Sequence, residues 1–432
     1  MSLLITRRTT PFRGTLTVPG DKSITHRALL FGALCSRRTV IHNYSSAADC
    51  TRTLAMLRSL AYVVDEQDGA WVVEGQKYQP SKAPLTIDCG NSGTTARLAA
   101  GFLTGERGTF TLTGDTSLSR RPMERVAAPL RQLGAQITTT QRAFPVSVIA
   151  DSRIPGKERG AIAVRSAQVH GALVLAGLRS RHGVRIRRES PMRDHTLRMA
   201  GLFGYRVESD GEVDSVTPRF LTDVSDLRCD VPGDFSSAAF PIAAALLVPD
   251  SELTLQNVGL NPTRIAFLDV LRQMGADIRR EVLSDSMEPV GDIHVRYSPE
   301  LRPVKLGAGS RIPVSLMLDE LPLLGLVASQ AVGTTEVRGA EELRVKESDR
   351  ITATVEMLCA LGIDAEERPD GFLVHGKGAP PKGGVAVRHH NDHRLAMVAG
   401  VAGLIAESPV AIPDHQIAAV SWPEVWSVLA GE

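Results

Sequence analysis

One pattern recurs six times along this chain and constrains its fold more than any other feature. Each copy begins with polar residues and continues into small apolar ones, as a capped core helix does. The openings read DKSITHRALLFGAL, NSGTTARLAAGFL, SAQVHGALVLAGL, DFSSAAFPIAAALL, DELPLLGLVAS and NDHRLAMVAGVAGLIA. Their starts lie 69 to 83 residues apart, counted at Ser23, Ser92, Ser166, Ser236, Asp319 and Asn391. This spacing predicts one supersecondary unit repeated six times.

A second series of segments lies in phase with the first. MLRSLAYVV, LRQLGAQI, GLFGYRVE, LRQMGADI and MLCALGIDA each read as a helix end, a Gly or Ala break and an alternating strand. Only five such joints are visible, and the sixth would fall at the C-terminal VWSVLAGE. We therefore expect the N-terminal LLITRRTTPFRGTLTVPG to supply the strand that the last helix lacks.

This closure of the chain predicts an α/β protein with two domains of three units each. The chain would cross between domains twice, and VPGDKS at 18–23 is echoed by VPGDFSS at 231–237. We place one domain at 21–232 and a discontinuous one at 1–20 plus 233–432. The cleft between two domains is the default ligand site.

The helix starts carry more positive charge than capping requires. A helix N-terminus holds about half a positive charge and several unpaired N–H groups, so it can bind an anion. The same openings contain Lys22, Arg27, Arg97 and Arg394. Any one opening is equally well explained as a capped core helix. The six together predict a site for a multiply charged ligand.

Composition argues against several classes of function. The 49 Lys and Arg against 48 Asp and Glu leave a net charge of +1, so no overall field attracts nucleic acid or a membrane. Five cysteines without paired spacing argue against disulfides and zinc and indicate a reducing compartment. No apolar run would span a bilayer, and the first polar motif begins by residue 20, which leaves no room for a signal peptide. We expect a cytoplasmic protein.

Polar motifs supply the candidate site residues. GDKSITHR places Lys22, Ser23 and Arg27 at a loop-to-helix junction without the upstream glycine of a P-loop. GNSGTTAR offers backbone N–H groups, although glycine-rich turns usually serve only geometry. RRPMER is more often a solvated face, but Arg121 before Pro122 has a restricted backbone suited to a fixed clamp. SAQ at 166–168 reads, taken singly, as an ordinary helix start.

Two charged motifs lie in the last third of the chain. In RVKESDR, Lys346 and Arg350 would share a helix face if the segment is helical, with Glu347 beside them. The alternative is a surface helix with weak ion pairs. HHNDHR resembles a metal cluster, but we discount it because His389 and His390 precede the helix and no matching ligands stand elsewhere.

As a set, GDKSITHRA, GNSGTTAR, RRPMERV, SAQ, DELP, RVKESDR and NDHR resemble the 5-enolpyruvylshikimate-3-phosphate (EPSP) synthase family, over about residues 10–425. The resemblance implies a two-domain inverse (inside-out) α/β barrel of six βαβαββ repeats, three per domain. It implies transfer of the enolpyruvyl group of phosphoenolpyruvate to the 5-hydroxyl of shikimate 3-phosphate, with release of phosphate. It also implies a monomer without metal or organic cofactor.

The resemblance also assigns residues. It implies catalytic roles for Asp319 as acceptor of the hydroxyl proton, Glu347 near the methylene of phosphoenolpyruvate, and Lys22. Phosphoenolpyruvate would be bound by Lys22, Gly93, Arg121, Gln168, Arg350 and Arg394. Shikimate 3-phosphate would be bound by Lys22, Ser23, Arg27, Ser166, Ala167, Gln168, Arg193, Asp319 and Lys346.

The chain departs from the family pattern in places. NPTR at 261–264 and RDH at 193–195 resemble class II members, which usually have Lys at the position of His170 and Glu at that of Leu197. SWP at 421–423 lacks the lysine that the other class places there. Gly93 matches members that the herbicide glyphosate inhibits, so we predict sensitivity.

Three alternatives stay open. A sister enolpyruvyl transferase acts on UDP-N-acetylglucosamine, but it typically has a cysteine where this chain has DTSLSRRP. A non-catalytic binder of phosphorylated metabolites would not need Asp319 and Glu347. A related RNA-end-processing protein is disfavoured by the neutral charge balance and the 4% aromatic content.

Overall fold

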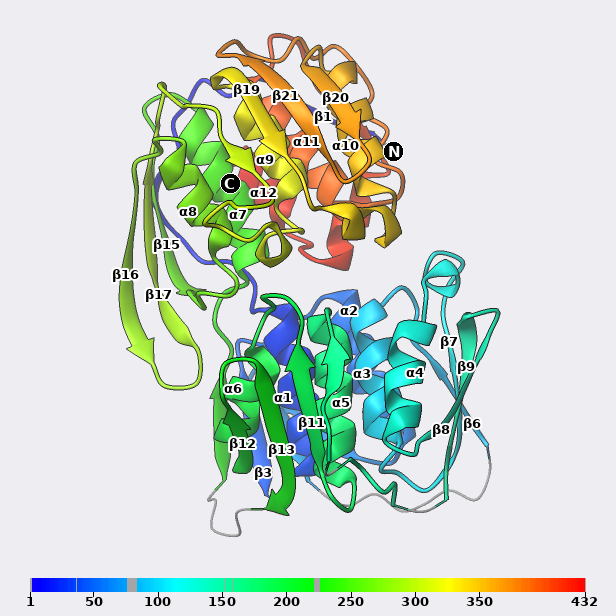
Figure 1. Ribbon diagram of the computed structural model, residues 1–432. Coiled ribbons are helices and arrows are strands. Elements are labelled where there is room, and N and C mark those ends of the chain that lie inside the picture. Colours follow the sequence, from blue (N-terminus) through cyan, green and yellow to red (C-terminus); the bar gives the residue numbers. More distant parts are fainter. Residues whose placement is uncertain are drawn as a thin grey trace. The chain divides into compact units, whose positions relative to one another are not determined.

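The computed structural model describes residues 2–35, 37–75, 84–151, 153–157, 159–220 and 226–431. It divides into two compact units, labelled by element in Figure 1. Unit 1 comprises Met1–Pro19 and Pro232–Glu432, and unit 2 comprises Gly20–Val231. The chain therefore passes between the units twice.

Unit 2 is built from three four-stranded sheets and six α-helices. The sheets, in strand order, are β14 (Leu227–Asp230), β3 (Arg38–His42), β5 (Ala70–Glu74), β4 (Val63–Gln67); β6 (Leu85–Asp88), β7 (Gly108–Thr113), β9 (Ala143–Ala150), β8 (Gln136–Thr140); and β10 (Ile162–Val164), β11 (Val184–Arg188), β13 (Val213–Phe220), β12 (Tyr205–Ser209). The helices are α1 (Lys22–Leu34), α2 (Ala48–Ser59), α3 (Gly93–Leu103), α4 (Glu124–Gln132), α5 (Ala167–Arg179) and α6 (His195–Leu202), with a 3₁₀ turn η1 (Leu118–Arg120).

Unit 1 has the same kinds of element. Its sheets are β16 (Ile278–Asp285), β17 (Pro289–Arg296), β15 (Glu252–Gly259), β2 (Arg13–Leu16); β18 (Lys305–Leu306), β19 (Val332–Val337), β21 (Gly371–Lys377), β20 (Asp364–Arg368); and the pair β1 (Ser2–Ile5), β22 (Val410–Pro413). Its helices are α7 (Phe235–Leu247), α8 (Ala266–Gln273), α9 (Leu321–Ser329), α10 (Arg350–Ala360), α11 (His393–Ile405) and α12 (Val425–Ala430). The 3₁₀ turns are η2 (Val314–Leu316), η3 (Glu341–Val345) and η4 (His415–Val420).

The five four-stranded sheets share one pairing pattern. In each, one pair at an edge of the sheet is parallel and the other two pairs are antiparallel, as in β6, β7, β9 and β8, where β6 and β7 are the parallel pair. In the sheet of β16, β17, β15 and β2, the parallel pair is β15 and β2. The two-stranded sheet follows a shortened version of it. There β1 pairs antiparallel with β22, and an isolated parallel bridge joins Ala386 to Ala411 of β22. The N-terminal strand thus completes a sheet formed by the C-terminal part of unit 1.

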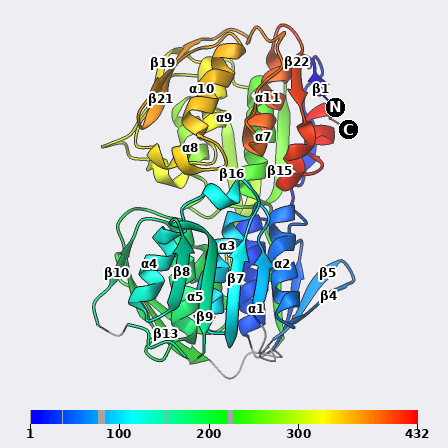
Figure 2. The same cartoon turned by 90° about the vertical axis from the view of Figure 1, so that its right-hand side faces the viewer.

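Six helices begin at the six predicted openings, within two residues of the positions counted in the sequence. These helices form the core because their small apolar side chains are buried on every side, as in α7 and α11, where all residues are buried. Figure 2 shows the sheets placed around the helices of each unit. Capping aspartates fix several starts: the Asp21 carboxylate accepts from the Ile24 N–H at 3.0 Å and that of Asp234 from the Ser236 N–H at 2.8 Å.

One predicted element differs from the structure. RVKESDR does not form a single helix, because η3 ends at Val345, Lys346 is extended, and α10 begins at Arg350. Asp349 caps α10 by accepting from the Ile351 and Thr352 N–H groups. Lys346 and Arg350 therefore do not share a helix face. Among the described helices, none has the length and apolar character needed to cross a membrane.

Candidate functional site

In unit 1, the buried guanidinium of Arg350 gathers three carboxylates. Nη1 lies 3.1 Å from Asp319 Oδ1, Nη2 lies 2.7 Å from Glu347 Oε2, and Nε lies 2.7 Å from Asp392 Oδ2. The Arg350 side chain is 1% exposed, whereas those of Asp319 and Glu347 are 17% and 23% exposed. The two predicted catalytic carboxylates are therefore held by one cation while each keeps a face open.

Three helix starts create this arrangement. Asp319 lies just before α9, Arg350 is the first residue of α10, and Asp392 caps α11 by accepting from the Arg394 N–H at 3.0 Å. Burial alone would lower the pKa of Arg350, but Asp392, Glu347 and Asp319 outweigh it and raise the pKa above the usual arginine value. Burial likewise opposes ionisation of Asp392, yet Arg350 lowers its pKa. Both groups stay charged at working pH.

Two more cations lie beside Asp319. Arg394 Nη2 is 3.6 Å from Asp319 Oδ2, and the Arg394 side chain is 10% exposed. Burial lowers the pKa of Lys346 below its usual value, although the charges of Asp319 and Glu342 oppose this shift. The Lys346 Nζ donates to Glu342 Oε1 at 3.4 Å. The structure thus brings together all five predicted site residues of unit 1: Asp319, Lys346, Glu347, Arg350 and Arg394.

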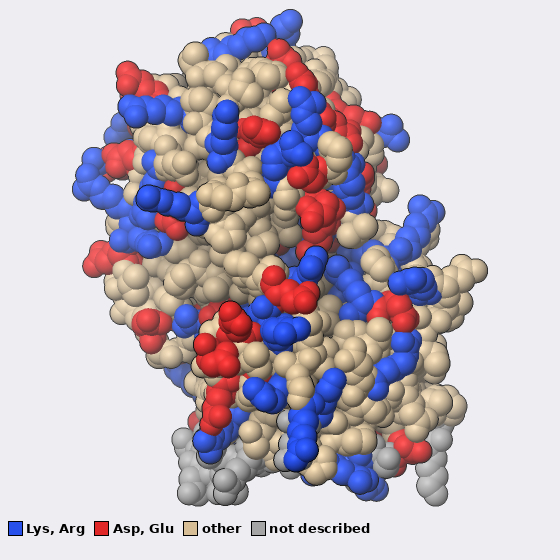
Figure 3. Space-filling view, in the orientation of Figure 1, with Lys and Arg blue, Asp and Glu red and all other residues tan. Residues whose placement is uncertain are grey.

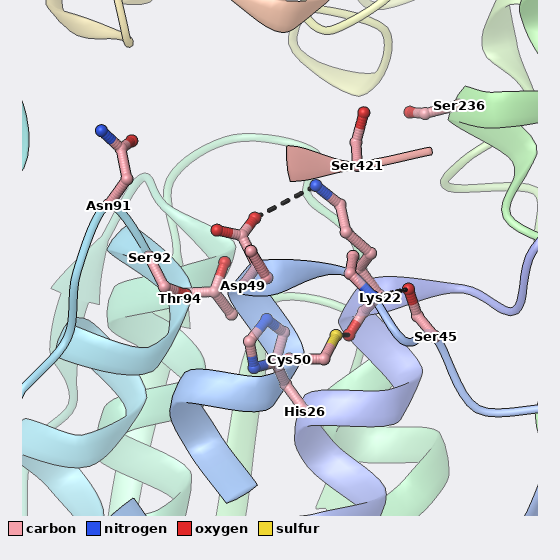
Figure 4. Close-up of polar contacts among 12 residues, drawn as sticks. Lys22, His26, Ser45, Asp49, Cys50, Asn91, Ser92, Thr94, Ser236 and Ser421 are labelled. Atoms are coloured by element: carbon pink, nitrogen blue, oxygen red, sulfur yellow. Dashed lines mark hydrogen bonds and ion pairs between the residues drawn. The ribbon is translucent and has the colours of Figure 1, made fainter. Parts of the chain in front are cut away.

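In unit 2, Lys22 begins α1 and points toward the start of α2. Its Nζ lies 3.1 Å from Asp49 Oδ2, and the two side chains are 15% and 19% exposed (Figure 4). The Cys50 Sγ donates to the Lys22 carbonyl at 3.7 Å, behind this pair. Since Asp49 fixes the amine without burying it fully, Lys22 can contact a ligand outside α1.

Two buried arginines of unit 2 flank the start of α3. A Cβ atom built on Gly93 would lie 2.8 Å from Arg97 Nη1 and 3.2 Å from Arg121 Nη1. Arg97 Nη1 donates to Gln168 Oε1 at 2.6 Å, and Arg121 Nη2 donates to Asn91 Oδ1 at 2.8 Å. Two guanidiniums at a helix N-terminus form a strong site for phosphate or carboxylate.

Replacing Gly93 with alanine should weaken the binding of an anion at this site. The added methyl group would press on Arg97 and Arg121 where the glycine now leaves room. The family resemblance places phosphoenolpyruvate at Gly93, so we expect KM for that anion to rise about ten-fold or more, with KM for shikimate 3-phosphate changed much less. Steady-state kinetics with each substrate varied in turn checks this, and an unchanged KM for phosphoenolpyruvate would contradict it.

The remaining predicted residues of unit 2 lie at the starts of α1, α5 and α6. Arg27 is 5% exposed and donates from Nε to Thr196 Oγ1 at 2.7 Å and from Nη1 to the Ser23 carbonyl at 2.8 Å. Ser166, Ala167 and Gln168 form the first turn of α5, and all three are half-buried. Gln168 Nε2 donates to Thr94 Oγ1 at 3.1 Å. Arg193 is half-buried just before α6.

A chain of buried hydrogen bonds joins the helices beneath Lys22. His26 Nδ1 bonds Thr53 Oγ1 at 2.7 Å, Thr53 bonds Thr95 at 2.8 Å, and the Thr95 hydroxyl donates to Ser92 Oγ at 2.8 Å. Burial, with the charges of Lys22 and Arg27, lowers the pKa of His26 to about 3. His26 is therefore neutral in the folded protein.

This histidine should make folding stability depend on pH. Its folded pKa of about 3 lies below the unfolded value of 6.5, so the unfolded chain binds the extra proton between these values and stability falls as the pH falls. From about pH 7 to about pH 5 the contribution lost is about 2 kcal/mol. We expect His26→Asn, which retains an acceptor for Thr53, to lose less stability in urea unfolding at the lower pH. Equal losses for both proteins would contradict this.

The chain departs from the family pattern at His170, Leu197 and the SWP segment at 421–423. His170 is 2% exposed, and its Nε2 lies 2.9 Å from the buried Asp214 Oδ2, which Arg188 Nε also contacts at 3.1 Å. The residue at this position thus forms a buried ion-pair network with β11 and β13. Leu197 is half-buried in α6, and Ser421 is buried after η4.

The histidine motif HHNDHR does not form a metal cluster. His389 Nε2 bonds the Pro413 carbonyl at 2.7 Å, His390 Nε2 bonds Glu356 at 2.8 Å, and His393 begins α11. Across the described parts of the chain, no three His, Cys, Asp or Glu side chains are grouped to hold a metal ion.

Positive and negative side chains are interspersed over the face of the molecule in Figure 3, so the basic groups act locally.

Sequence reasoning did not assign three residues of these clusters to a substrate. Asp392 is the third carboxylate paired with Arg350, Asp49 forms an ion pair with Lys22, and Arg97 donates a hydrogen bond to Gln168. The sequence feature that points to Asp392 is its capping position in the sixth opening. Arg97 is one of the cations noted at the helix openings, and it lies in the second opening, which forms α3. Asp49 in SAADC carries no motif, so only the packing of α1 on α2 reveals it.

Comparison with known proteins gives the same family as the motifs. The family model for EPSP synthase (3-phosphoshikimate 1-carboxyvinyltransferase) matches residues 6–429. The chain is 44% identical over 427 residues to the 3-phosphoshikimate 1-carboxyvinyltransferase of Persephonella marina, covering 96% of each protein. The corresponding enzyme of Geobacillus kaustophilus is 43% identical over 422 residues, covering 96% of this chain and 97% of the relative.

Solved structures resemble this one over its whole length. An EPSP synthase from Acinetobacter baumannii aligns with a TM-score of 0.83 and 35% identity, covering all of this chain and 97% of that one. The enolpyruvyl transferase NikO from Streptomyces tendae shares the fold, with a TM-score of 0.76 and 17% identity. On the full-length family match and the identity to its relatives, this chain belongs to the EPSP synthase (3-phosphoshikimate 1-carboxyvinyltransferase) family.

Proposed function

We propose how the residues of the two units carry out the reaction of this family. The chain is a carboxyvinyltransferase of the shikimate pathway, which leads to the aromatic amino acids. It transfers the enolpyruvyl group of phosphoenolpyruvate to the 5-hydroxyl of shikimate 3-phosphate and releases phosphate through a tetrahedral intermediate. Both substrates are multiply charged anions, which the cationic groups around the helix starts can bind.

The reaction needs a group that moves a proton at each reacting centre. The hydroxyl oxygen bonds to C2 of phosphoenolpyruvate while the hydroxyl loses its proton and the methylene gains one to become a methyl group. The C2–O bond to phosphate then breaks, and the methyl group returns a proton to form the new enol ether. In our proposal Asp319 accepts the hydroxyl proton, Glu347 exchanges protons with the methylene carbon, and Lys22 assists while it holds phosphoenolpyruvate.

The observation that carries this assignment is the shared contact of Asp319 and Glu347 with Arg350. One buried cation holds both carboxylates in place, yet each remains partly exposed and able to reach a substrate. In unit 2, the arginines beside Gly93 provide a site for the phosphate or carboxylate of phosphoenolpyruvate.

The binding roles follow the same grouping. We assign phosphoenolpyruvate to Lys22, Gly93, Arg121, Gln168, Arg350 and Arg394. Shikimate 3-phosphate is assigned to Lys22, Ser23, Arg27, Ser166, Ala167, Gln168, Arg193, Asp319 and Lys346. Unit 1 and unit 2 thus supply residues to the same two substrates in this proposal.

Single arginine substitutions in each unit test that claim. Arg121→Met in unit 2 and Arg394→Met in unit 1 should each raise KM for phosphoenolpyruvate by about 10- to 100-fold, because each removes a charged donor to the same anion. Arg296→Met is the control, since Arg296 is 54% exposed in an ion pair with Glu252. If only the variants of one unit change this KM, the other unit does not bind phosphoenolpyruvate.

The repeated architecture also belongs to the proposal. The common strand pairing of five sheets and the shortened sixth support six βαβαββ units in an inverse α/β barrel, three per domain. We further propose a cytoplasmic monomer. Five free cysteines, four of them buried, fit a reducing compartment. Light scattering during gel filtration should give a mass near 46.4 kDa, and twice that mass would overturn the monomer.

A further inference from the structure

Arg264 lies in a second buried ion-pair network of unit 1. Its side chain is 4% exposed, and Nη2 lies 3.1 Å from Asp234 Oδ1 and 2.7 Å from Ser236 Oγ. Nη1 lies 3.5 Å from Glu320 Oε1, and the Ser236 hydroxyl donates to the same oxygen of Glu320. In the sequence, NPTR marked only a subclass, and the proposed reaction gives Arg264 no role.

The acidic partners of Arg264 stand at the starts of two core helices. Asp234 caps α7, and Glu320 is the residue before α9. The turn that carries Arg264 is itself fixed: Asn261 Oδ1 accepts from the Thr263 N–H at 2.9 Å, and Asn261 Nδ2 donates to the buried Glu288 at 2.7 Å. Arg264 therefore ties the start of α9 to the start of α7 from a rigid turn.

Arg264 and Arg350 form similar bridges between helix starts. Arg264 precedes α8 by two residues and joins the starts of α7 and α9, while Arg350 begins α10 and joins the starts of α9 and α11. The two bridges meet at adjacent residues, because Arg264 contacts Glu320 and Arg350 contacts Asp319. The peptide that carries Asp319 is thus held through both side chains.

We infer that Arg264 is a positioning residue for Asp319, acting through Glu320. This inference rests on the proposed role of Asp319 as the group that accepts the hydroxyl proton. Proton transfer requires the carboxylate within hydrogen-bond reach of the hydroxyl, and a displacement of about 1 Å can lower a rate about 100-fold. Without Arg264, the buried Glu320 loses its cation, and the start of α9 loses one of its links to the start of α7.

A double-mutant cycle tests the inference on the full-length protein. We expect Arg264→Met to lower kcat about 10- to 100-fold, with KM for both substrates changed less than about three-fold. In an Asp319→Ala background the same substitution should lower the residual kcat less than about two-fold, because the positioned group is already gone. An equal fold-loss in both backgrounds, or an unchanged kcat for Arg264→Met alone, would overturn the inference.

Two further variants separate positioning from folding. Glu320→Gln keeps the shape of the side chain but removes its charge, and it should reproduce the loss of kcat at a smaller size. Arg264→Lys retains the charge and should be more active than Arg264→Met. If Arg264 served only packing, the two variants would have the same activity. Thermal unfolding of each variant shows whether the assay temperature lies below its transition. If Asp319→Ala alone leaves kcat unchanged, the proposed role of Asp319 fails, which is a different result from a silent Arg264→Met.

Discussion

Replacing Asp319 with asparagine is expected to lower kcat by roughly 10²- to 10⁴-fold, the range for loss of a general base. The amide has the size of the carboxylate but cannot take the proton of the attacking hydroxyl. KM values should change much less. In the unmodified protein Arg350 Nη1 lies 3.1 Å from Asp319 Oδ1, and the amide oxygen of asparagine can still accept from this group. Steady-state phosphate release measures both constants.

Thermal unfolding provides the control for this variant. Arg350 keeps Glu347 and Asp392 as partners when Asp319 is neutralised, so the unfolding transition should shift little. A kcat within about three-fold of the unmodified protein would show that Asp319 is not the proton acceptor. In that case Glu347 or Lys22 would have to perform both proton transfers.

Arg350→Met should damage both catalysis and folding. It removes the guanidinium that contacts the fully buried Asp392 and leaves Asp319 and Glu347 without their shared cation. Breaking a buried ion pair in this way costs about 3–5 kcal/mol of stability. We expect that loss in urea unfolding, together with a fall in kcat/KM of about 10³-fold or more.

A second substitution separates the two effects. Arg350→Met combined with Asp392→Asn should recover part of the stability, because the buried charge no longer lacks a counterion. It should recover no activity, since Asp319 and Glu347 still lack Arg350. If Arg350→Met alone is as stable and active as the unmodified protein, the carboxylates are not organised by this guanidinium.

Local sequence patterns were sufficient to predict the core helices. Most starts carry a capping side chain and are followed by small apolar residues, so the signal lies within a few consecutive positions, as at Asp21 and Asp234. The strand after each second-series helix is equally local. The family motifs then named Asp319 and Glu347, the proposed catalytic residues that Arg350 brings together.

Contacts between distant residues could not be predicted in the same way. The pairs Lys22 with Asp49 and Arg350 with Asp392 depend on how separate helices pack, which no single motif contains. The sequence left open whether RVKESDR is helical, and in the structure Asp349 instead caps a new helix that begins at Arg350. The periodicity of the sequence indicates which charged residues lie on a helix. The packing of the helices determines which residue each of them pairs with.

The proposed reaction has one acceptor for the enolpyruvyl group, which is shikimate 3-phosphate. Phosphate release from phosphoenolpyruvate should therefore be measured with shikimate 3-phosphate, with unphosphorylated shikimate and with UDP-N-acetylglucosamine, using Glu347→Gln as the inactive control. We predict release with shikimate 3-phosphate alone, and its loss in the variant. Release only with the nucleotide sugar, or binding of both anions without any release, would contradict the account.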